Sequence, residues 1–202
     1  MEGAEKTTTA RRDRPFDLEI HDLAARNNEA AADLAGGKFT LAIALFQHAL
    51  DGCFAVLGPD HPDTLTVAGN LGVALVKAGR YSDGLELIGA NVADRVRVLG
   101  DEDPRTLAAR DALAVAYRLA GHAGDAVAVA KQVTEQRRRV LGPAHLDTLT
   151  SRVGLALANA AMGDVATAAE EITAALGDAE RVHGTDHERT VALLHCAVTL
   201  AQ

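Results

Sequence analysis

The stretch VLGPDHPDTL, residues 56–65, returns three more times along this chain in recognisable form. Its valine, its glycine and its polar cluster keep their places in VLGDEDPRTL at 98–107, VLGPAHLDTL at 140–149 and VHGTDHERTV at 182–191. The copies begin at 56, 98, 140 and 182, so the period is 42 residues. A fixed period of this size predicts a repeat array, in which each unit buries its apolar face against its neighbours.

Each 42-residue unit is predicted to contain two helices. Glycine adopts the left-handed backbone conformation that other residues resist, so it commonly ends a helix. The glycine of the repeated stretch is predicted to end the second helix of each unit (helix B). Another set of glycines, also 42 residues apart, is predicted to end the first helix (helix A). The polar cluster should then begin the next helix A by accepting hydrogen bonds from its free N–H groups, although the capping residue within 60–63 stays open. The second set consists of Gly37, Gly79, Gly121 and Gly163.

Apolar residues are spaced as on helices, and strand patterns are weak. Alanine and leucine, which are abundant from Phe16 onward, are strong helix formers. One helix-B position is always small and should let helix B pack closely on helix A of its own unit. The small residues are Ala42, Gly84, Ala126 and Ala168; in the second unit the apolar stripe of helix A comprises Leu65, Ala68, Leu71, Gly72 and Leu75, and that of helix B comprises Tyr81, Gly84, Leu85, Ile88 and Val92.

The chain is therefore predicted to be all-α, with four helix pairs followed by one more helix A. The last helix either covers the final apolar face or leaves an edge that pairs with another molecule. Residues 1–15 contain almost nothing apolar and are expected to be disordered. The repeat domain is expected at 16–202, with helix pairs at about 16–56, 59–98, 101–140 and 143–182 and the closing helix at 187–201.

Composition argues against several classes of partner. The chain has 20 Lys and Arg against 28 Asp and Glu, a formal net charge of −8. Phosphate neutralisation needs a basic face, so no nucleic-acid partner is expected. The apolar runs look too short to span a bilayer and the N-terminus has no apolar signal core, so no membrane partner is expected either. Cys53 and Cys196 are expected to be reduced, and the protein to be cytoplasmic.

The sequence offers little support for catalysis or for a metal site. It contains no phosphate-binding loop, dinucleotide fingerprint or nucleophile-elbow motif. His61 and His145 recur with the period and are expected to serve loop geometry. The best cluster joins His183, His187 and Cys196 with His195, but Gly184 interrupts the helix between the first two. We expect no metal, no cofactor and no catalytic residues.

One family carries the same set of features. The chain shows Leu71-Gly72, Leu75, Gly79-x-Tyr81, Gly84 and then Leu-Gly-x-x-His-Pro-Asp-Thr-Leu. This pattern resembles the tetratricopeptide repeat, in the 42-residue form found in kinesin light chain. The form Thr-Leu-x-x-Arg at 106–110 and 148–152 is similar to bacterial members of that group. The resemblance implies a right-handed superhelix (an α-solenoid) that serves as an interaction scaffold.

Stacked helix pairs of this kind leave a concave wall made mainly by the A helices. In kinesin-light-chain-like repeats, an Asn pair at the positions of Asn27 and Asn28 contacts the main chain of a bound peptide. Asparagine offers a donor and an acceptor, the Val and Leu positions offer an apolar floor, and Asp111 and Arg118 could select charge. The candidate peptide-binding residues are Asn27, Asn28, Gly69, Asn70, Val73, Asp111, Val115, Arg118, Val153 and Leu157, with Val76 placed on the same face.

The expected function is a non-catalytic scaffold that binds a segment of a protein or peptide partner in this groove. The same residues could instead be ordinary solvated ones, or the groove could be filled by the chain's own tail. One alternative function is homodimerisation through the C-terminal helix, by Val191, Leu194 and Val198. Another is a groove adapted to a small molecule, for a sensor or an enzyme.

Three arginines share one register on the core side of helix A: Arg26, Arg110 and Arg152. A partly buried arginine needs a carboxylate or several carbonyls, so structural pairing between repeats is expected. Asp94 and Glu135, late in the preceding B helices, are the candidate partners. A ladder of anion-binding sites is the alternative.

Overall fold

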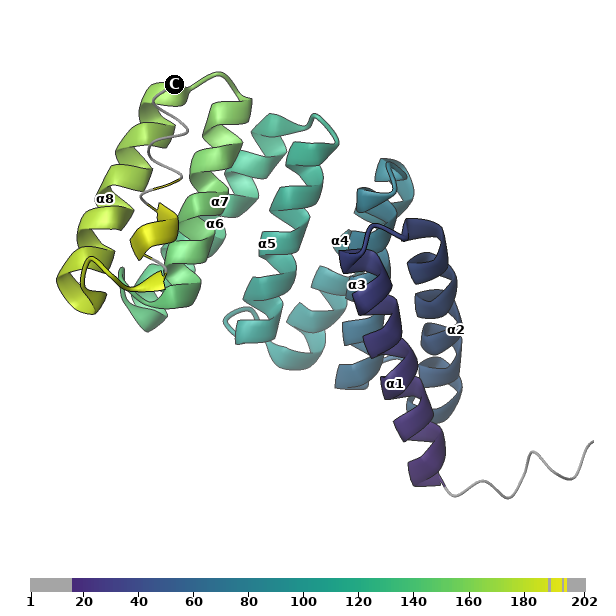
Figure 1. The fold of residues 1–202 in the computed structure, drawn as a ribbon. Coiled ribbons are helices and arrows are strands. Elements are labelled where there is room, and N and C mark those ends of the chain that lie inside the picture. Colours follow the sequence, from purple (N-terminus) through teal and green to yellow (C-terminus); the bar gives the residue numbers. More distant parts are fainter. Residues whose placement is uncertain (1–15, 189, 194, 196–202) are drawn as a thin grey trace, which may run out of the picture.

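The computed structural model describes residues 16–188, 190–193 and 195, with side chains from residue 19 onward. The predicted disordered segment 1–15 lies outside these residues. The described part is helical throughout apart from short connections, and the helices stand side by side in pairs along the molecule (Figure 1). The all-α solenoid prediction is confirmed. The helices are α1 (Phe16–Ala35), α2 (Phe39–Leu57), α3 (Pro62–Lys77), α4 (Tyr81–Leu99), α5 (Pro104–Leu119), α6 (Ala123–Leu141), α7 (Leu146–Ala161) and α8 (Val165–His183).

Both glycine sets end helices as the sequence indicates. All eight glycines have φ between +75° and +94°, where other residues would be strained. The open question of the cap is settled as well: the Nδ1 atom of His61 accepts a hydrogen bond from the Asp63 N–H at 3.2 Å. His145 caps α7 in the same way, and Asp103 caps α5 through its carboxylate. The recurring histidines therefore serve loop geometry, as predicted.

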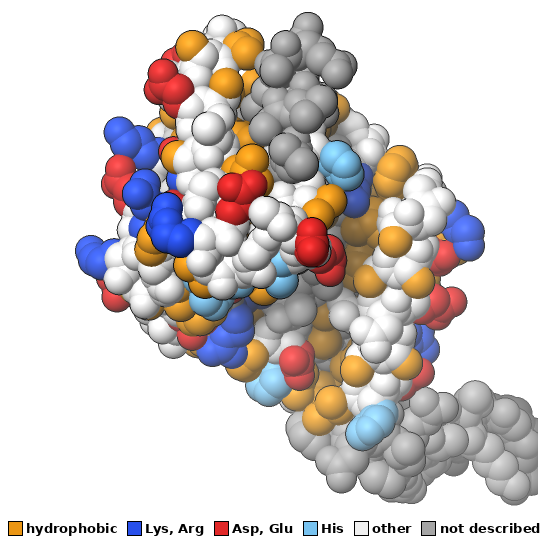
Figure 2. All heavy atoms as spheres, turned by 60° about the vertical axis from the view of Figure 1, so that its left-hand side comes forward, with side chains coloured by type: hydrophobic (Ala, Val, Ile, Leu, Met, Phe, Trp, Pro, Cys, Tyr) orange, Lys and Arg blue, Asp and Glu red, His pale blue; other side chains and the backbone are white. Residues whose placement is uncertain are grey.

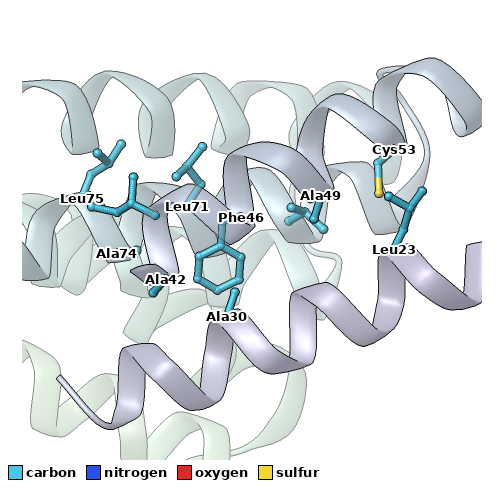
Figure 3. Close-up of a cluster of buried hydrophobic side chains, with 11 residues drawn as sticks. Leu23, Ala30, Ala42, Phe46, Ala49, Cys53, Leu71, Ala74 and Leu75 are labelled. Carbon is cyan, nitrogen blue, oxygen red and sulfur yellow. The ribbon is translucent and has the colours of Figure 1, made fainter. Parts of the chain in front are cut away.

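The core runs between successive helices, and its largest cluster of buried apolar residues lies at the first three. Phe46 of α2 is fully buried, and its ring lies beside Ala30 of α1 (Figure 3). Leu71 and Leu75 of α3 close the same cluster. Burying a phenylalanine side chain contributes about 1.5–3 kcal/mol, so this cluster is a main source of stability for the N-terminal repeats.

The small position in helix B allows a close approach of two helices, as predicted. A Cβ added at Gly84 would meet Val76 Cγ2 at 2.5 Å and the Gly72 carbonyl oxygen at 3.0 Å. Two assignments from the sequence are wrong. Val76 is only 4% exposed, because it packs against Ile88 and Ala116 rather than facing the groove. Tyr81 is 41% exposed, because it stands in the first turn of α4, beyond the stripe that packs on α3.

One described helix, α2, is long and apolar enough to cross a membrane by length and composition alone. This differs from the expectation that the apolar runs are too short. Ala42, Phe46 and Ala49 are nevertheless fully buried in the core between α1 and α3. A core helix of a repeat array passes the same hydropathy test, so we assign α2 to the core of the first repeat.

The described residues after His187 continue as a helix that packs on α7 and α8. Leu193 and Thr190 are each 2% exposed, and Leu193 joins the cluster that contains Leu149 and Ile172. This contact covers part of the apolar surface of α7 and α8. Val191 is 38% exposed; Leu194 and residues 196–202, which include Cys196 and Val198, lie outside the described residues.

Candidate functional site

The A helices form one layer of the solenoid. Each contacts helix B of its own repeat and also the next helix A, so α1, α3, α5 and α7 follow one another along the molecule (Figure 1). Two hollows lie on this layer, one between α1 and α3 and one between α3 and α5. They share one lining residue, Thr66, so the two hollows adjoin each other along α1, α3 and α5.

The first hollow has a volume of about 120 Å³. Its walls come from α1, the end of α2 and the start of α3, and they include two of the predicted site residues, Asn27 and Asn28. Cys53 also lines it, and burial raises the pKa of the Cys53 thiol, which keeps it in the uncharged form. The full lining is Ile20, Leu23, Ala24, Asn27, Asn28, Cys53, Leu57, Asp63, Thr66 and Val67.

The second hollow is larger, about 210 Å³, and is lined by α3, α4 and α5. Three more predicted site residues stand in its wall: Gly69, Asn70 and Val73. Small side chains on α5 leave the space open. The full lining is Thr66, Gly69, Asn70, Val73, Ile88, Asn91, Arg95, Arg105, Ala108, Ala109 and Ala112.

The two predicted asparagines in neighbouring repeats bind each other. Asn70 Nδ2 donates a hydrogen bond to Asn27 Oδ1 at 3.0 Å. Both side chains are half-buried, and the pair connects the two hollows. Each amide keeps capacity for further hydrogen bonds: Asn27 has its NH₂ group, and Asn70 has its carbonyl oxygen. The pairing fixes the orientation of both amides relative to the two hollows.

The later A helices continue the inner face beyond the hollows. Val115 of α5 is 42% exposed and Leu157 of α7 is 38% exposed, at intervals of 42 residues from Val73. Arg118 and Val153 are half-buried, and Val153 packs partly against the core cluster of α7 and α8. None of these four residues lines either hollow.

The prediction that Asp111 selects ligand charge in the groove is wrong. The Asp111 carboxylate lies 2.6 Å from Nη1 of Arg137 and accepts a hydrogen bond from Ser151 Oγ at 2.9 Å. Arg137 also donates to Ser151 Oγ and to the Asp147 carbonyl oxygen. The side chain therefore ties α5 to α6 and α7, because a buried guanidinium on α6 needs a carboxylate.

The structure adds a charged residue that the sequence analysis missed. Arg95 of α4 is 8% exposed and lines the second hollow. Its Nε donates to Asn91 Oδ1 at 2.9 Å, and its Nη2 lies 3.5 Å from Thr66 Oγ1. Burial, followed by the nearby charge of Arg105, lowers the pKa of the Arg95 guanidinium. Arginine stays protonated at neutral pH despite such a shift, so a positive charge is held in the wall of the hollow.

The three arginines of the helix-A register are paired, but the prediction of pairing between repeats is wrong, because each binds partners within its own repeat. Arg152, 1% exposed, binds Glu171 at 2.6 Å and Asp178 at 2.7 Å, both on α8. Arg110 binds Asp101 and Gln136, and Arg26 binds Asp22 and approaches His48. These side chains reach helix B of their own repeat or a residue nearby in sequence. Asp94 pairs with Arg97 instead, and Glu135 is exposed.

Charges of both signs are interspersed on the face shown in Figure 2, with no broad patch of a single sign. Among the described residues, no group of three His, Cys, Asp or Glu side chains is arranged to hold a metal ion. The rings of His183 and His187 stack with centroids 4.8 Å apart. The His183 imidazole Nε2 lies 2.7 Å from the Ala144 carbonyl oxygen, which connects the α8 end to the loop before α7.

Two family models, both described as the tetratricopeptide repeat, match residues 22–88 and 106–147, which together make up more than half of the chain. The chain is a tetratricopeptide-repeat protein. Repeats of this family generally mediate protein–protein interaction. No curated protein sequence matches this tetratricopeptide-repeat protein significantly.

Among solved structures, the repeats of kinesin light chain are similar to those of this chain. The TPR-like repeats of a kinesin light chain from Podosopora anserina superpose with a TM-score of 0.77 at 25% identity, covering 94% of this chain and 88% of that one. A form of that protein with one residue substituted gives 0.78 at 25% identity, with 90% and 85% covered. BtubC (BKLC) from P. vanneervenii shares the fold, with a TM-score of 0.65 at 15% identity, and covers 94% and 87%. The tetratricopeptide repeats of this chain are thus of the kinesin-light-chain type.

Proposed function

We propose that this protein is a non-catalytic scaffold that binds an extended peptide segment of a protein partner along the inner face of its A helices. The observation that carries the proposal is the pair of adjoining hollows on the A-helix layer. They present unused amide groups of Asn27 and Asn70 beside apolar wall residues such as Val73.

An extended peptide fits this surface chemically. Its main chain alternates N–H donors and C=O acceptors, which the amide groups of asparagine can match. Every second side chain of an extended peptide points to the same side and needs an apolar surface to contact. The hollows, followed along the A-helix layer by the exposed side chains of Val115 and Leu157, offer such surfaces one after another. Cytoplasmic proteins are the partners that we expect.

The proposal is tested with a displayed library of random 12-residue peptides, selected on the whole chain. Selected peptides are then measured by fluorescence anisotropy on the wild type, on the groove variant Asn70→Ala/Val115→Glu and on the control Val140→Glu. Val140 is 49% exposed on a B helix, so this change adds the same charge away from the inner face.

We expect the groove variant to weaken peptide binding by at least about tenfold, the loss of one or two well-formed contacts, and the control to leave it unchanged. Circular dichroism confirms that both variants fold. Equal affinity of the peptides for all three proteins would show that they do not bind at Asn70 and Val115 on the inner face. Failure of the library to yield any binder would argue against peptide recognition.

A further inference from the structure

The third helix pair, α5 and α6, has smaller core side chains than the other three. One buried position of helix B faces helix A of its own repeat and recurs every 42 residues. It holds a large side chain in the first, second and fourth repeats and Ala130 in the third, which therefore buries much less apolar surface there. The residues at this position are Phe46, Ile88, Ala130 and Ile172, each at most 2% exposed.

A second position of helix B shows the same loss. Thr134, four residues after Ala130, stands where the other repeats have leucine or valine packed against an apolar cluster. Its side chain is 2% exposed, and its hydroxyl group has no hydrogen-bond partner among the described residues. A buried hydroxyl without a partner is unfavourable, so Thr134 destabilises the third repeat. Its counterparts are Leu50, Val92 and Leu176.

The apolar core is interrupted at α6. The buried residues of the first cluster come from α1, α2 and α3, those of a small cluster from α3, α4 and α5, and those of the last from α7, α8 and the described helix after His187. None of these clusters of described residues contains a residue of α6. The two larger clusters, at the two ends of the array, include neither α5 nor α6, so each end has an apolar core of its own.

Polar contacts hold the third repeat in place. Arg137 on α6 pairs with Asp111 on α5 at 2.6 Å and donates a hydrogen bond to Ser151 on α7 at 2.9 Å. Gln136 on α6 donates to Asp101, in the loop before α5, at 2.6 Å. Ion pairs repay the desolvation of their own charges and add little beyond it, so these contacts position the repeat without replacing the missing apolar burial.

We propose that α5 and α6 open and close together as one unit while the helix pairs on both sides stay folded. In an ordinary repeat array the end units open first, because they have one neighbour where an inner unit has two. The smaller core at Ala130 and Thr134 reverses this order. This opening is a property of the free chain. It also removes one wall of the second hollow, which α5 supplies through Ala108, Ala109 and Ala112.

The first experiment is hydrogen exchange of the free wild-type chain, followed by mass spectrometry of peptic fragments and corrected for intrinsic rates. We expect the slowest amides of α5 and α6 to exchange at least about tenfold faster than those of α2–α3 and of α7–α8, because large-to-small changes in a core lower its stability. Equal protection of the three groups, or faster exchange in α7–α8 than in α5–α6, would overturn the proposal.

The second experiment repairs the core of the third repeat. The variant Ala130→Ile/Thr134→Leu introduces the counterparts from the fourth repeat, Ile172 and Leu176. The facing helix A carries a buried alanine at the same position in both repeats, so the larger side chains have the same neighbour there. We expect exchange in α5–α6 to become at least about tenfold slower. An unchanged rate in a folded variant would refute the role of these two positions.

Thr134→Val provides the same test if the double variant does not fold. Valine has the shape of threonine without the hydroxyl group, so exchange in α5–α6 should slow by about fivefold. Thr64→Val is the matched control, because the Thr64 hydroxyl donates to the Gly58 carbonyl oxygen at 2.8 Å and its loss should speed exchange in α3. Slower exchange in both variants would contradict the explanation from the unpartnered hydroxyl, and no slowing in Thr134→Val would contradict it as well.

The third experiment separates local opening from unfolding of the whole chain. Phe46→Leu weakens the first apolar cluster and should speed exchange in α2–α3 at least about fivefold. The rate in α5–α6 should stay the same, because Phe46 is equally packed whether α5 and α6 are closed or open. An equal rise in α5–α6 would show that these helices exchange only when the whole chain unfolds, and the separate unit would be refuted.

Discussion

The two central buried arginines should contribute very differently to stability, although they occupy the same position in their repeats. Replacing Arg137 with methionine keeps most of the apolar stem and removes the charge. It leaves the Asp111 carboxylate, 23% exposed at its side chain, with Ser151 as its remaining hydrogen-bond partner. Replacing Arg95 with methionine removes a buried charge that forms no ion pair with any of the described carboxylates.

The magnitudes follow from these contacts. Breaking a buried ion pair by removing one member costs about 3–5 kcal/mol, and the partial exposure of Asp111 reduces this to about 2–4 kcal/mol for Arg137→Met. Arg95→Met loses one good hydrogen bond, to Asn91 at 2.9 Å, and one at the 3.5 Å limit, to Thr66. That loss of about 1 kcal/mol is offset by relief of the desolvation cost, so the net change should lie within about 1 kcal/mol of zero.

The assay is urea denaturation followed by circular dichroism at 222 nm, with hydrogen exchange to localise the change to α5–α7 or to α3–α5. The expected loss of about 2–4 kcal/mol for Arg137→Met corresponds to roughly 4–16 °C in melting temperature for a chain of this size. Adding Asp111→Asn to Arg137→Met should recover part of the loss, because no unpaired charge remains. If Arg95→Met costs as much as Arg137→Met, Arg95 is a structural requirement and the reasoning is refuted.

Three further outcomes are expected. Burial by itself would raise the pKa of Asp178, but hydrogen bonds from Arg152 and then Arg181 lower it below the unfolded value near 3.8. The ionised Asp178 carboxylate therefore stabilises the fold above pH 3.8, and this stabilisation is lost as the pH falls through the lowered pKa of the folded state. Asp178→Asn should accordingly destabilise the protein at pH 7, and the difference from the wild type should vanish in unfolding titrations at acid pH. His61→Ala should lower the unfolding free energy by about 1 kcal/mol in the same urea assay, because it removes the cap of α3. His61→Asp should leave the unfolding free energy unchanged or raise it by up to about 1 kcal/mol, because a carboxylate is a good cap at a positive helix end. Ala126→Leu should cost about 1–3 kcal/mol, measured by thermal melting, because Ala126 is fully buried where helix B meets helix A.

The period made most of the fold predictable. Each glycine with positive φ recurs every 42 residues, so helix ends could be placed from a single sequence. Helical spacing then identified Leu71, Leu75 and Ile88 as core residues, and all three are at most 5% exposed. Val76 was misassigned because a helix packed on both sides buries more than one stripe. Its neighbours α4 and α5 cover the face that was assigned to the groove.

The site was predictable only in part, because polar side chains choose partners in three dimensions. Asn27 and Asn70 were predicted to lie on neighbouring A helices and each lines a hollow, but their mutual hydrogen bond depends on the offset between α1 and α3. Asp111 was assigned to the groove because of its position on the inner side of α5, yet its carboxylate forms an ion pair with the guanidinium of Arg137 on α6. The presence of Arg95 and Arg137 at one register, with glycine at 69 and aspartate at 111, was the signal that could have identified the missed arginine.

A repeat array can carry an unneutralised buried charge more easily than a single-core protein of the same size. Stability in such an array is close to a sum of units and nearest-neighbour interfaces, so the cost at Arg95 falls on α3, α4 and α5 alone. The cluster around Phe46, the largest set of buried apolar residues among the described helices, includes Leu71 and Leu75 of α3 and can offset that cost. The same residue type in the next repeat is fully paired, so the burial of arginine at this position does not by itself require a ligand. What differs around Arg95 is that Gly69 and Ala109 stand at the positions that Asp111 and Ser151 hold in the next repeat. These small residues line a hollow beside Arg95, and they leave its positive charge without a paired carboxylate.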